Sequence, residues 1–267
     1  MSKKIRTIFI NSKKNYKELK NLKNVFKVVK NINDADICIS VGGDGTFIDS
    51  AKIFNGPILP ISSNEKGSAS YYCDIGLSDI ERIIEDLSNG KYYTQNLSRK
   101  IKISYKGKDY YAVNEALLRN FSGNVYFEIY AKLTKNDKKE KLYPFIMGGD
   151  GALITSVIGS TAYNMSANGP IIVNDGSLCI TFLNVNGPFK NPIVISSDAV
   201  VYIKVVKYKG LLKFDDDEIS LLKPKDEFKV SLSDQCLKVI KFPDMRESFA
   251  DKLEKIISSK MIKSQDK

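Results

Sequence analysis

The first hundred residues alternate between short apolar runs and segments with apolar residues at helical spacing. The apolar runs predict buried strands at residues 5–10, 25–29, 37–41 and 57–61. The helical spacing predicts helices at residues 13–22, 47–54 and 80–87. Alternating strands and helices are typical of a parallel α/β sheet, so we expect a Rossmann-like domain over residues 1–98.

The pattern changes near residue 100 to short strands separated by frequent turn signals. Residues 101–105 and 110–113 predict a hairpin. Further strands are expected at residues 125–133, 152–155, 178–183, 199–206, 228–232 and 237–242. This pattern favours a second, mostly β, sandwich-like domain over residues 99–244.

The end of the chain, residues 245–267, returns to helical spacing. Its apolar stripe consists of Phe249, Leu253, Ile256, Ile257 and Met261. A lone helix cannot bury such a stripe on its own. We therefore expect this C-terminal helix to pack back on the first domain.

The turn after the strand at residues 37–41 brings together three glycines and an acid, Gly42-Gly43-Asp44-Gly45-Thr46. Glycine permits positive φ and close approach of a ligand, and the start of a helix favours phosphate. Asp44 would repel a bare phosphate, so we interpret it as a group that takes a proton or holds a metal beside one. A simple chain reversal without a ligand is the alternative for this turn.

The longest polar motif lies in the second half, at residues 148–172. A strand leads to Gly159-Ser160-Thr161, and we expect Ser160 or Thr161 to cap a short helix that runs through Ala167. Small hydroxyl groups at a helix start suit a ribose, a phosphate or an amide. An ordinary capped helix explains the same residues equally well.

Composition narrows the chemistry. The 267 residues include no histidine, which excludes His-containing triads and His metal sites and leaves Asp, Glu, Lys, Tyr or Cys as a general base. The four cysteines lack paired spacing, which indicates reduced cysteines in the core of a cytoplasmic protein. The net charge of +10 comes from lysines spread along the whole chain, which favours a polyanionic small molecule over nucleic acid. No apolar run approaches ~20 residues, so no membrane span is expected.

Three motifs, in order, resemble those of the NAD kinase family. The first is the turn at residues 42–46, which diacylglycerol-type lipid kinases and 6-phosphofructokinases also share. The second is Asn114-Glu115. The third is Asp150-Gly151 followed by the run from Gly159 to Ile171, which lipid kinases are not expected to carry. The resemblance covers residues 37–172.

The resemblance implies a role for each matching residue. Asp44 is implied as the base for the 2′-hydroxyl of the adenosine ribose of NAD, and Gly42, Gly43 and Thr46 as contacts to the donor phosphates. The implied NAD contacts are Gly45, Asn114, Glu115, Asp150, Ser160, Thr161, Ala162, Tyr163, Asn164 and Ser166. Asp49, Tyr71 and Tyr72 are weaker candidates near the ligand. The family also implies Mg²⁺, ATP or polyphosphate as donor, and a homodimer or homotetramer.

Two stretches depart from the family pattern. At residues 60–72 the usual Gly-(Val/Ile)-Asn and Leu-Gly-Phe are replaced by a longer run, and residues 186–192 lack the usual His and Arg. These changes leave the donor and the choice between NAD and NADH open. Two alternatives to an NAD kinase therefore stay open: a lipid kinase that shares only the first motif, and an NAD(P)-binding sensor without a working donor site.

Overall fold

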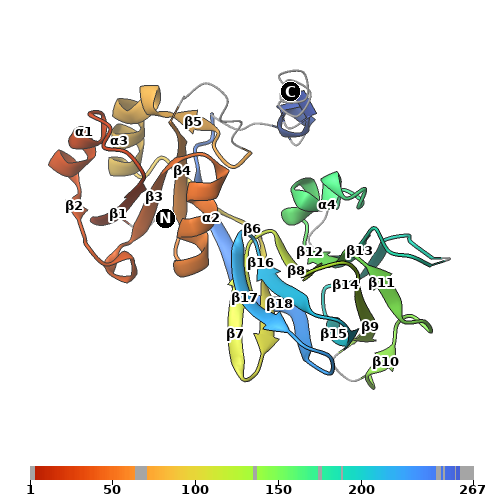
Figure 1. The fold of residues 1–267 in the computed structure, drawn as a ribbon. Coiled ribbons are helices and arrows are strands. Elements are labelled where there is room, and N and C mark those ends of the chain that lie inside the picture. The colour runs from red at the N-terminus through yellow and green to blue at the C-terminus, as the bar shows by residue number, and fades with distance from the viewer. Residues whose placement is uncertain are drawn as a thin grey trace. The chain divides into compact units, whose positions relative to one another are not determined.

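The structure, a computed structural model, describes residues 4–63, 71–134, 137–173, 176–187, 189–244, 248, 250–255 and 257–258. It divides into two compact units (Figure 1). The first unit comprises Met1–Leu97 together with Leu237–Lys267, and the second comprises Ser98–Cys236. The chain passes between the units within two long strands, β6 (Tyr93–Tyr105) and β18 (Glu227–Lys241).

The first unit is built on a parallel sheet, as its sequence pattern predicts. Its strands follow the order β18-β4-β3-β1-β2, with β5 paired to β4. These strands pair in parallel: β1 with β2 and β3, and β4 with β3, β5 and β18. The strands are β1 (Thr7–Ser12), β2 (Lys27–Val28), β3 (Ile37–Gly42), β4 (Ile58–Ser62) and β5 (Ile75–Gly76).

Helices cover both faces of this sheet (Figure 1). Helices α1 (Leu19–Val25) and α3 (Ile80–Ser88) lie together on one face, and α2 (Asp44–Ile53) lies on the other. The alternation of β3 explains this division. Ile37 and Ile39 join the apolar cluster formed with α1 and α3, whereas the neighbouring Cys38 lies near Ser50 of α2.

The helix expected at residues 13–22 begins only at Leu19, because the lysines and the asparagine before it form bends and turns.

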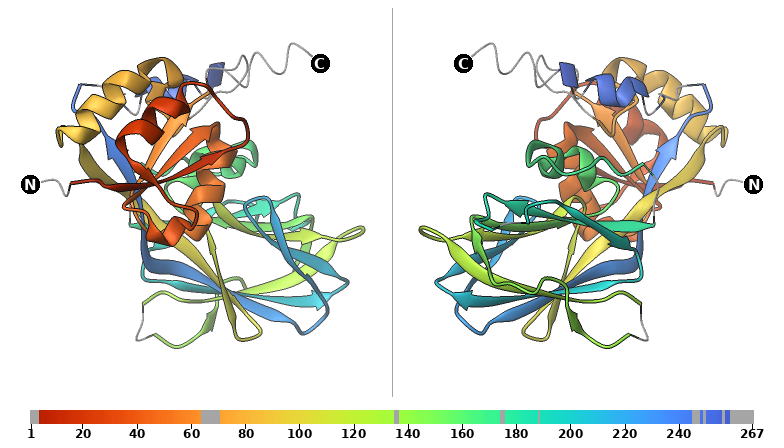
Figure 2. Two further views of the ribbon diagram at one scale, coloured as in Figure 1. Left: turned by 90° about the vertical axis from the view of Figure 1, so that its left-hand side faces the viewer. Right: turned by 90° about the vertical axis from the view of Figure 1, so that its right-hand side faces the viewer.

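The second unit is a sandwich of two sheets (Figure 2). One sheet contains β10-β9-β15-β18, with β11 paired to β9 and the β6–β7 hairpin paired to β18. The other has the order β14-β13-β12-β8-β16-β17. Alternate residues of both sheets form one apolar core, which includes Phe127 and Val201 from the first sheet and Leu118 and Ile180 from the second.

The strands named in the sandwich have the following bounds: β7 (Lys108–Ala112), β8 (Glu115–Asn120), β9 (Val125–Lys132), β10 (Glu140–Lys141), β11 (Met147–Gly149), β12 (Gly151–Thr155), β13 (Ser177–Leu183), β14 (Ile193–Ser196), β15 (Val200–Lys207), β16 (Gly210–Phe214) and β17 (Asp217–Leu222).

The strands expected at residues 228–232 and 237–242 are one strand, β18. The polar residues between them continue in extended conformation instead of turning. The end of β18 belongs to the first unit, where Val239 pairs with Ile58 and Ile240 enters the apolar core. The unit boundary therefore falls after Cys236 and not after residue 244.

The C-terminal segment is helical at the described residues 250–255 and 257–258 and belongs to the first unit. Lys252 forms an ion pair with Asp74 of the first unit at 2.8 Å, so the helix returns to the first unit as expected. Of the predicted stripe, Leu253 is half-buried and Ile257 is exposed. Phe249, Ile256 and Met261 lie outside the described residues.

Candidate functional site

The glycine turn has a steric origin. Gly42, the last residue of β3, has φ +155°, and a Cβ atom there would lie 2.5 Å from Oγ1 of Thr46. Gly43 is the N-cap of α2, which begins at Asp44. Thr46 is buried beneath Gly42, so its side chain packs within the turn.

Asp44 is held by backbone amides from a distant segment. The N–H of Tyr71 donates to Oδ2 at 3.1 Å, and the N–H of Tyr72 donates to Oδ1 at 3.3 Å. Burial raises the pKa of the Asp44 carboxyl, while the two amides and the positive charge of Lys252 act in the opposite direction. The carboxylate is thus partly desolvated and fixed in orientation, which suits a general base.

Tyr71 and Tyr72 meet Asp44 through their backbone, and an aromatic contact fixes them there. The ring of Tyr72 stacks on Phe47 of α2 with the ring centroids 4.3 Å apart, and Tyr71 meets Tyr72 edge-on. Asp49, the third weaker candidate, is exposed and lies 3.9 Å from Lys52 in an ion pair on the outside of α2.

In the second unit, a buried carboxylate shapes the Asn114-Glu115 motif. Asp215 accepts the backbone N–H groups of Val113 and Asn114 at 3.0 and 2.8 Å, and that of Glu115 at 3.3 Å. This arrangement fixes the main chain of the motif at the start of β8.

Glu115 itself is 6% exposed, and its Oε2 atom has no hydrogen-bond partner among the residues that the structure describes. Burial, reinforced by the nearby Asp215 and Asp216, raises the pKa of Glu115 to about 8. A buried carboxyl oxygen without a partner is a strong candidate for ligand contact.

The third motif approaches the second motif closely. A Cβ atom on Gly159 would lie 1.9 Å from the backbone oxygen of Asn114, so only glycine fits there. Thr155, at the end of β12, donates its hydroxyl to the same oxygen at 2.7 Å. The two motifs therefore form one polar region within the second unit.

The expected helix cap is wrong. The N-cap of the short helix α4 (Tyr163–Ser166) is Ala162, with no side-chain cap. The hydroxyl of Ser160 instead donates to the carbonyl of Val157 at 2.7 Å and accepts the N–H of Ile172 at 3.0 Å. The hydroxyl of Thr161 donates to the carbonyl of Ile158. These hydroxyls fold the loop back on itself.

The residues of α4 divide between structural and exposed positions. Asn164 is fully buried, donates to the carbonyl of Pro170 at 2.8 Å and accepts the hydroxyl of Thr181 at 2.6 Å. Tyr163 is 39% exposed and Ser166 is also exposed. Asn164 thus supports the helix, while Tyr163 and Ser166 are open to a ligand.

Two asparagines orient Asp150. Asn120 donates to its Oδ1 atom at 3.0 Å, and Asn184 donates to its Oδ2 atom at 2.7 Å. Gly151 follows with φ +141°, and a Cβ atom on it would lie 1.9 Å from the carbonyl oxygen of Leu118. The Asp-Gly pair therefore holds a carboxylate in a defined position just before the start of β12.

Sequence reasoning missed the residues that hold the motifs in place: Asp215, Asn120 and Asn184. Asp215 stands in an Asp-Asp-Asp run that resembles an ordinary solvated turn. Asp215 has a positive φ of 46° in the turn between β16 and β17, and the sequence alone does not reveal this backbone conformation. In the part of the chain that the structure describes, no group of three or more acidic or cysteine side chains is placed to hold a metal.

Solved structures with the same fold are kinases of pyridine nucleotides. An NAD kinase from Archaeoglobus fulgidus in complex with ATP superposes with a TM-score of 0.72 at 14% identity, covering 94% of this chain and 99% of that one. Yeast NADH kinase complexed with NADH gives a TM-score of 0.78 at 14% identity, covering 96% and 88%. Both superpositions cover nearly the whole chain and show that it has the fold of these structures.

Sequence comparison gives the family. Residues 2–92 match the ATP-NAD kinase N-terminal domain, and residues 114–242 match its C-terminal domain. An NAD kinase of Clostridium beijerinckii is 30% identical over 249 residues, covering 86% of this chain and 84% of the relative. One of Fusobacterium nucleatum is 29% identical over 253 residues, covering 90% and 91%. The chain belongs to the NAD kinase family.

Proposed function

We propose that this protein is an NAD kinase, which transfers a phosphoryl group to the 2′-hydroxyl of the adenosine ribose of NAD and yields NADP. The observation that carries the proposal is Asp44, a partly desolvated carboxylate at the start of α2, oriented by two amides within a glycine turn. Its place in the first NAD kinase motif supports the same role. The chemistry requires a base of this kind, because the attacking hydroxyl must lose its proton.

The remaining residues are assigned by unit. In the first unit, we propose that the main chain at Gly42 and Gly43 contacts the donor phosphates, with Thr46 supporting the turn from within. In the second unit, we propose that Glu115, Asp150 and Tyr163 contact NAD. Asn164 and the hydroxyls of the Gly-Ser-Thr run act by holding that surface in shape.

ATP is the proposed donor, and Mg²⁺ is proposed to arrive bound to its phosphates as part of the substrate. The described acidic residues do not form a metal site of their own, so the charge neutralisation would come from the donor's own ion. Polyphosphate remains the second donor to be tested.

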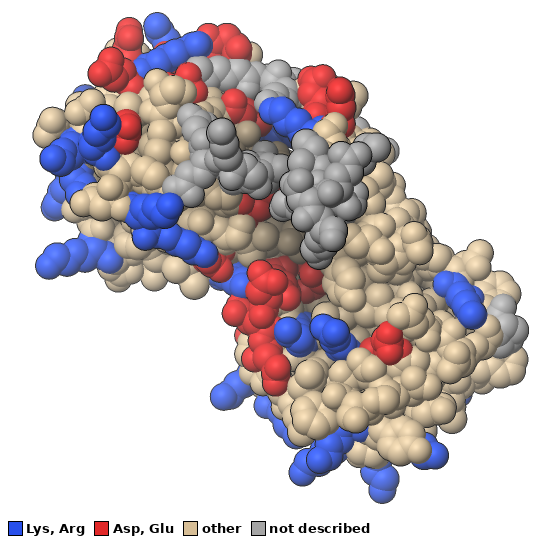
Figure 3. Space-filling model, turned by 45° about the horizontal axis from the view of Figure 1, so that its top comes forward, with Lys and Arg blue, Asp and Glu red and all other residues tan. Residues whose placement is uncertain are grey.

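We also propose a cytoplasmic homo-oligomer that acts on small molecules. No helix in the described residues is long and apolar enough to cross a membrane. On the face shown in Figure 3, lysine and arginine side chains are scattered and do not form a single patch, which favours a small polyanion over nucleic acid.

One assay tests the function. Purified protein is incubated with NAD or NADH, with ATP or polyphosphate and with Mg²⁺, and NADP(H) is measured by a coupled dehydrogenase. We expect Mg²⁺-dependent NADP formation. A folded protein that forms no NADP(H) from any donor would contradict the proposal.

The same preparation separates the two alternatives. A lipid kinase would phosphorylate diacylglycerol in mixed micelles, which we do not expect from a chain with both NAD kinase domains. A sensor would bind NAD in calorimetry without turnover.

A further inference from the structure

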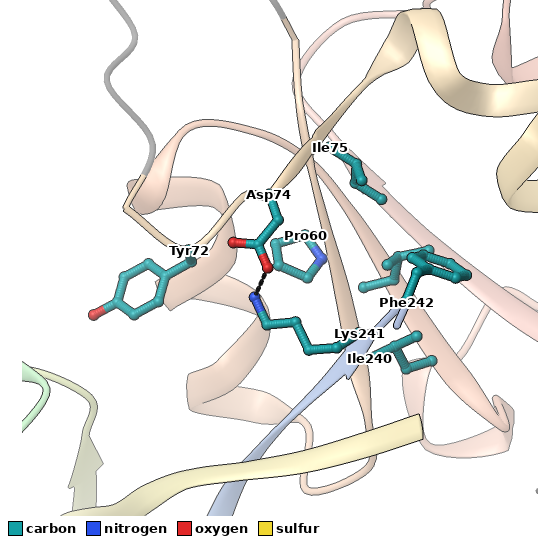
Figure 4. Close-up of a pocket in the computed structure, with 8 residues that line it drawn as sticks. Pro60, Tyr72, Asp74, Ile75, Ile240, Lys241 and Phe242 are labelled. Atoms are coloured by element: carbon teal, nitrogen blue, oxygen red, sulfur yellow. Dashed lines mark hydrogen bonds and ion pairs between the residues drawn. The ribbon is translucent and has the colours of Figure 1, made fainter. Parts of the chain in front are cut away.

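An ion cluster beneath Asp44 joins three parts of the first unit. The side chain of Asp74 forms ion pairs with Lys241, near the end of β18, and with Lys252 of the C-terminal helix. The three side chains are 6%, 8% and 15% exposed, respectively. Figure 4 shows Asp74 and Lys241 directed toward each other beside Tyr72.

Lys252 contacts the segment that binds Asp44 at more than one point. Besides its ion pair with Asp74 at 2.8 Å, its Nζ atom donates to the backbone oxygen of Tyr71 at 3.3 Å. The same nitrogen lies 5.4 Å from the centroid of the Tyr71 ring. The C-terminal helix is therefore tied to the residues whose amides orient Asp44.

The charges of the cluster balance only if Asp44 is included. Asp74 neutralises one of the two lysines, and the second positive charge faces Asp44, whose pKa it lowers against the effect of burial. Lys241 and Lys252 are both largely buried and pair with the same carboxylate, Asp74. Burial and the neighbouring Lys252 lower the pKa of Lys241. Removing Lys252 would leave Asp44 with its burial and without this compensating charge.

We propose that Lys252 is a positioning residue for phosphoryl transfer: anchored by Asp74, it fixes the Tyr71–Asp74 segment so that the two backbone amides hold the Asp44 carboxylate in its working orientation. The inference rests on the proposed function for its kinetic test. It gives the C-terminal helix a direct part in organising the site.

The first test compares Lys252→Met with Lys255→Met, a change of the same kind at an exposed position of the same helix. We expect kcat of Lys252→Met to fall by roughly 10- to 100-fold, in the range that a small misplacement of a catalytic group produces. The KM for NAD should change little, and Lys252→Arg should recover most of the rate. Lys255→Met should behave as wild type.

The pH profile separates positioning from simple anchoring of the helix. In the described residues, Asp44 is faced by the amides of Tyr71 and Tyr72 and by the charge of Lys252, and the thiol of Cys73 points to the carbonyl of Gly42. Without Lys252, the acid limb of kcat should move to higher pH. A Lys252→Met enzyme with wild-type kcat and an unmoved acid limb would overturn the inference.

Two further measurements keep the inference testable if that variant folds poorly or the wild type proves inactive. Asp74→Asn keeps the shape but removes the charge between both lysines, and it should reproduce the loss of kcat. Amide hydrogen exchange at Tyr71 and Tyr72 needs no turnover and should become faster in Lys252→Met. Unchanged exchange would overturn the inference, whereas an inactive wild type would contradict only the proposed function.

Discussion

Asp44 is the residue that we propose as the general base. The substitution Asp44→Asn keeps the shape and one acceptor oxygen but removes the basicity. We expect kcat to fall by roughly 10²–10⁴, the range for a positioned general base, with near-normal affinity for NAD. Steady-state kinetics with NAD and ATP measures this.

Stability provides the control for Asp44→Asn. In the variant, the oxygen of the new amide side chain can still accept one backbone N–H, whereas its NH₂ group faces the other N–H and that hydrogen bond is lost. The free energy of unfolding should therefore change by only about 1 kcal/mol. Activity near that of wild type at every Mg²⁺ concentration would show that the turn serves the fold alone.

Glu115 should make stability depend on pH. Its pKa in the folded protein, about 8, lies above the value of 4.5 expected when unfolded. Between these values the folded state keeps a proton that the unfolded state has lost, so the free energy of unfolding falls as pH rises from about 4.5 to about 8. The substitution Glu115→Gln should flatten this slope in denaturation measured across the window.

The matched control for Glu115 is Glu85→Gln, at an exposed position of α3. It should leave the slope as in wild type. A Glu115→Gln protein whose stability follows the wild-type pH curve would contradict the burial argument.

Tyr163 distinguishes a ligand contact from a core aromatic. Loss of a buried aromatic side chain lowers the free energy of unfolding by about 3–5 kcal/mol. Because the Tyr163 ring is 39% exposed, Tyr163→Ala should cost far less and should lower the melting temperature only slightly. We expect a raised KM for NAD with little change in stability. A large drop in melting temperature with an unchanged KM would assign Tyr163 to the fold.

At this scale, the sequence pointed to candidate site residues more readily than to the residues that hold them in place. Asp44 and Glu115 stand in recognisable motifs, and the structure places both in partly or fully buried surroundings. The hydroxyls of Ser160 and Thr161 were predicted to cap a helix, because Ser and Thr favour that position. They instead bond to nearby carbonyls, a choice made by a loop conformation that no local pattern specifies.

Among the elements, the loop before α4 (Tyr163–Ser166) has no room for a side chain at Gly159. Gly159→Ala would place a methyl group against the carbonyl oxygen of Asn114. We expect the overpacking to lower stability by about 1–3 kcal/mol and to raise the KM for NAD, since the Asn114-Glu115 motif must shift. Thermal denaturation and kinetics of the same preparation check both effects.

The control for this glycine is Gly187→Ala, where a Cβ atom would meet nothing within 4 Å. It should leave stability and KM close to the wild-type values. Equal effects from the two substitutions would mean that the close approach of the two motifs has no functional weight.

Sequence periodicity predicted the elements with local signals and failed where tertiary pairing decides. Strands β3 and β4 follow from apolar runs, and α3 (Ile80–Ser88) follows from a clear apolar stripe. Strand β5 (Ile75–Gly76) was not predicted, and the strand expected at residues 25–29 is only β2 (Lys27–Val28). Strand β18 (Glu227–Lys241) was expected as two strands, because the polar run Ser233-Asp234-Gln235 resembles a turn. The strand pairs with β15 before that run and with β4 after it, and a single sequence does not display these partners.

For the whole molecule, the division into an α/β unit and a β sandwich was predictable, because alternating strands and helices give way to short strands near residue 100. The boundary near the end was not. Residues 237–242 read as one more strand of the β-rich half, yet they complete the parallel sheet of the first unit through Val239 and Ile58.

Because of that division, the second unit can fold on the ribosome before the first unit is complete. Residues 98–236 form one uninterrupted stretch, whereas the first unit lacks the end of β18 and Lys241 until residues 237–241 have been synthesised. Nascent chains stalled with residue 236 just outside the exit tunnel should therefore resist protease across the sandwich and be cut within residues 1–97. Equal protection of both halves at that stall would contradict this order. Residues 1–97 are thus synthesised before the sandwich but acquire their final form after it.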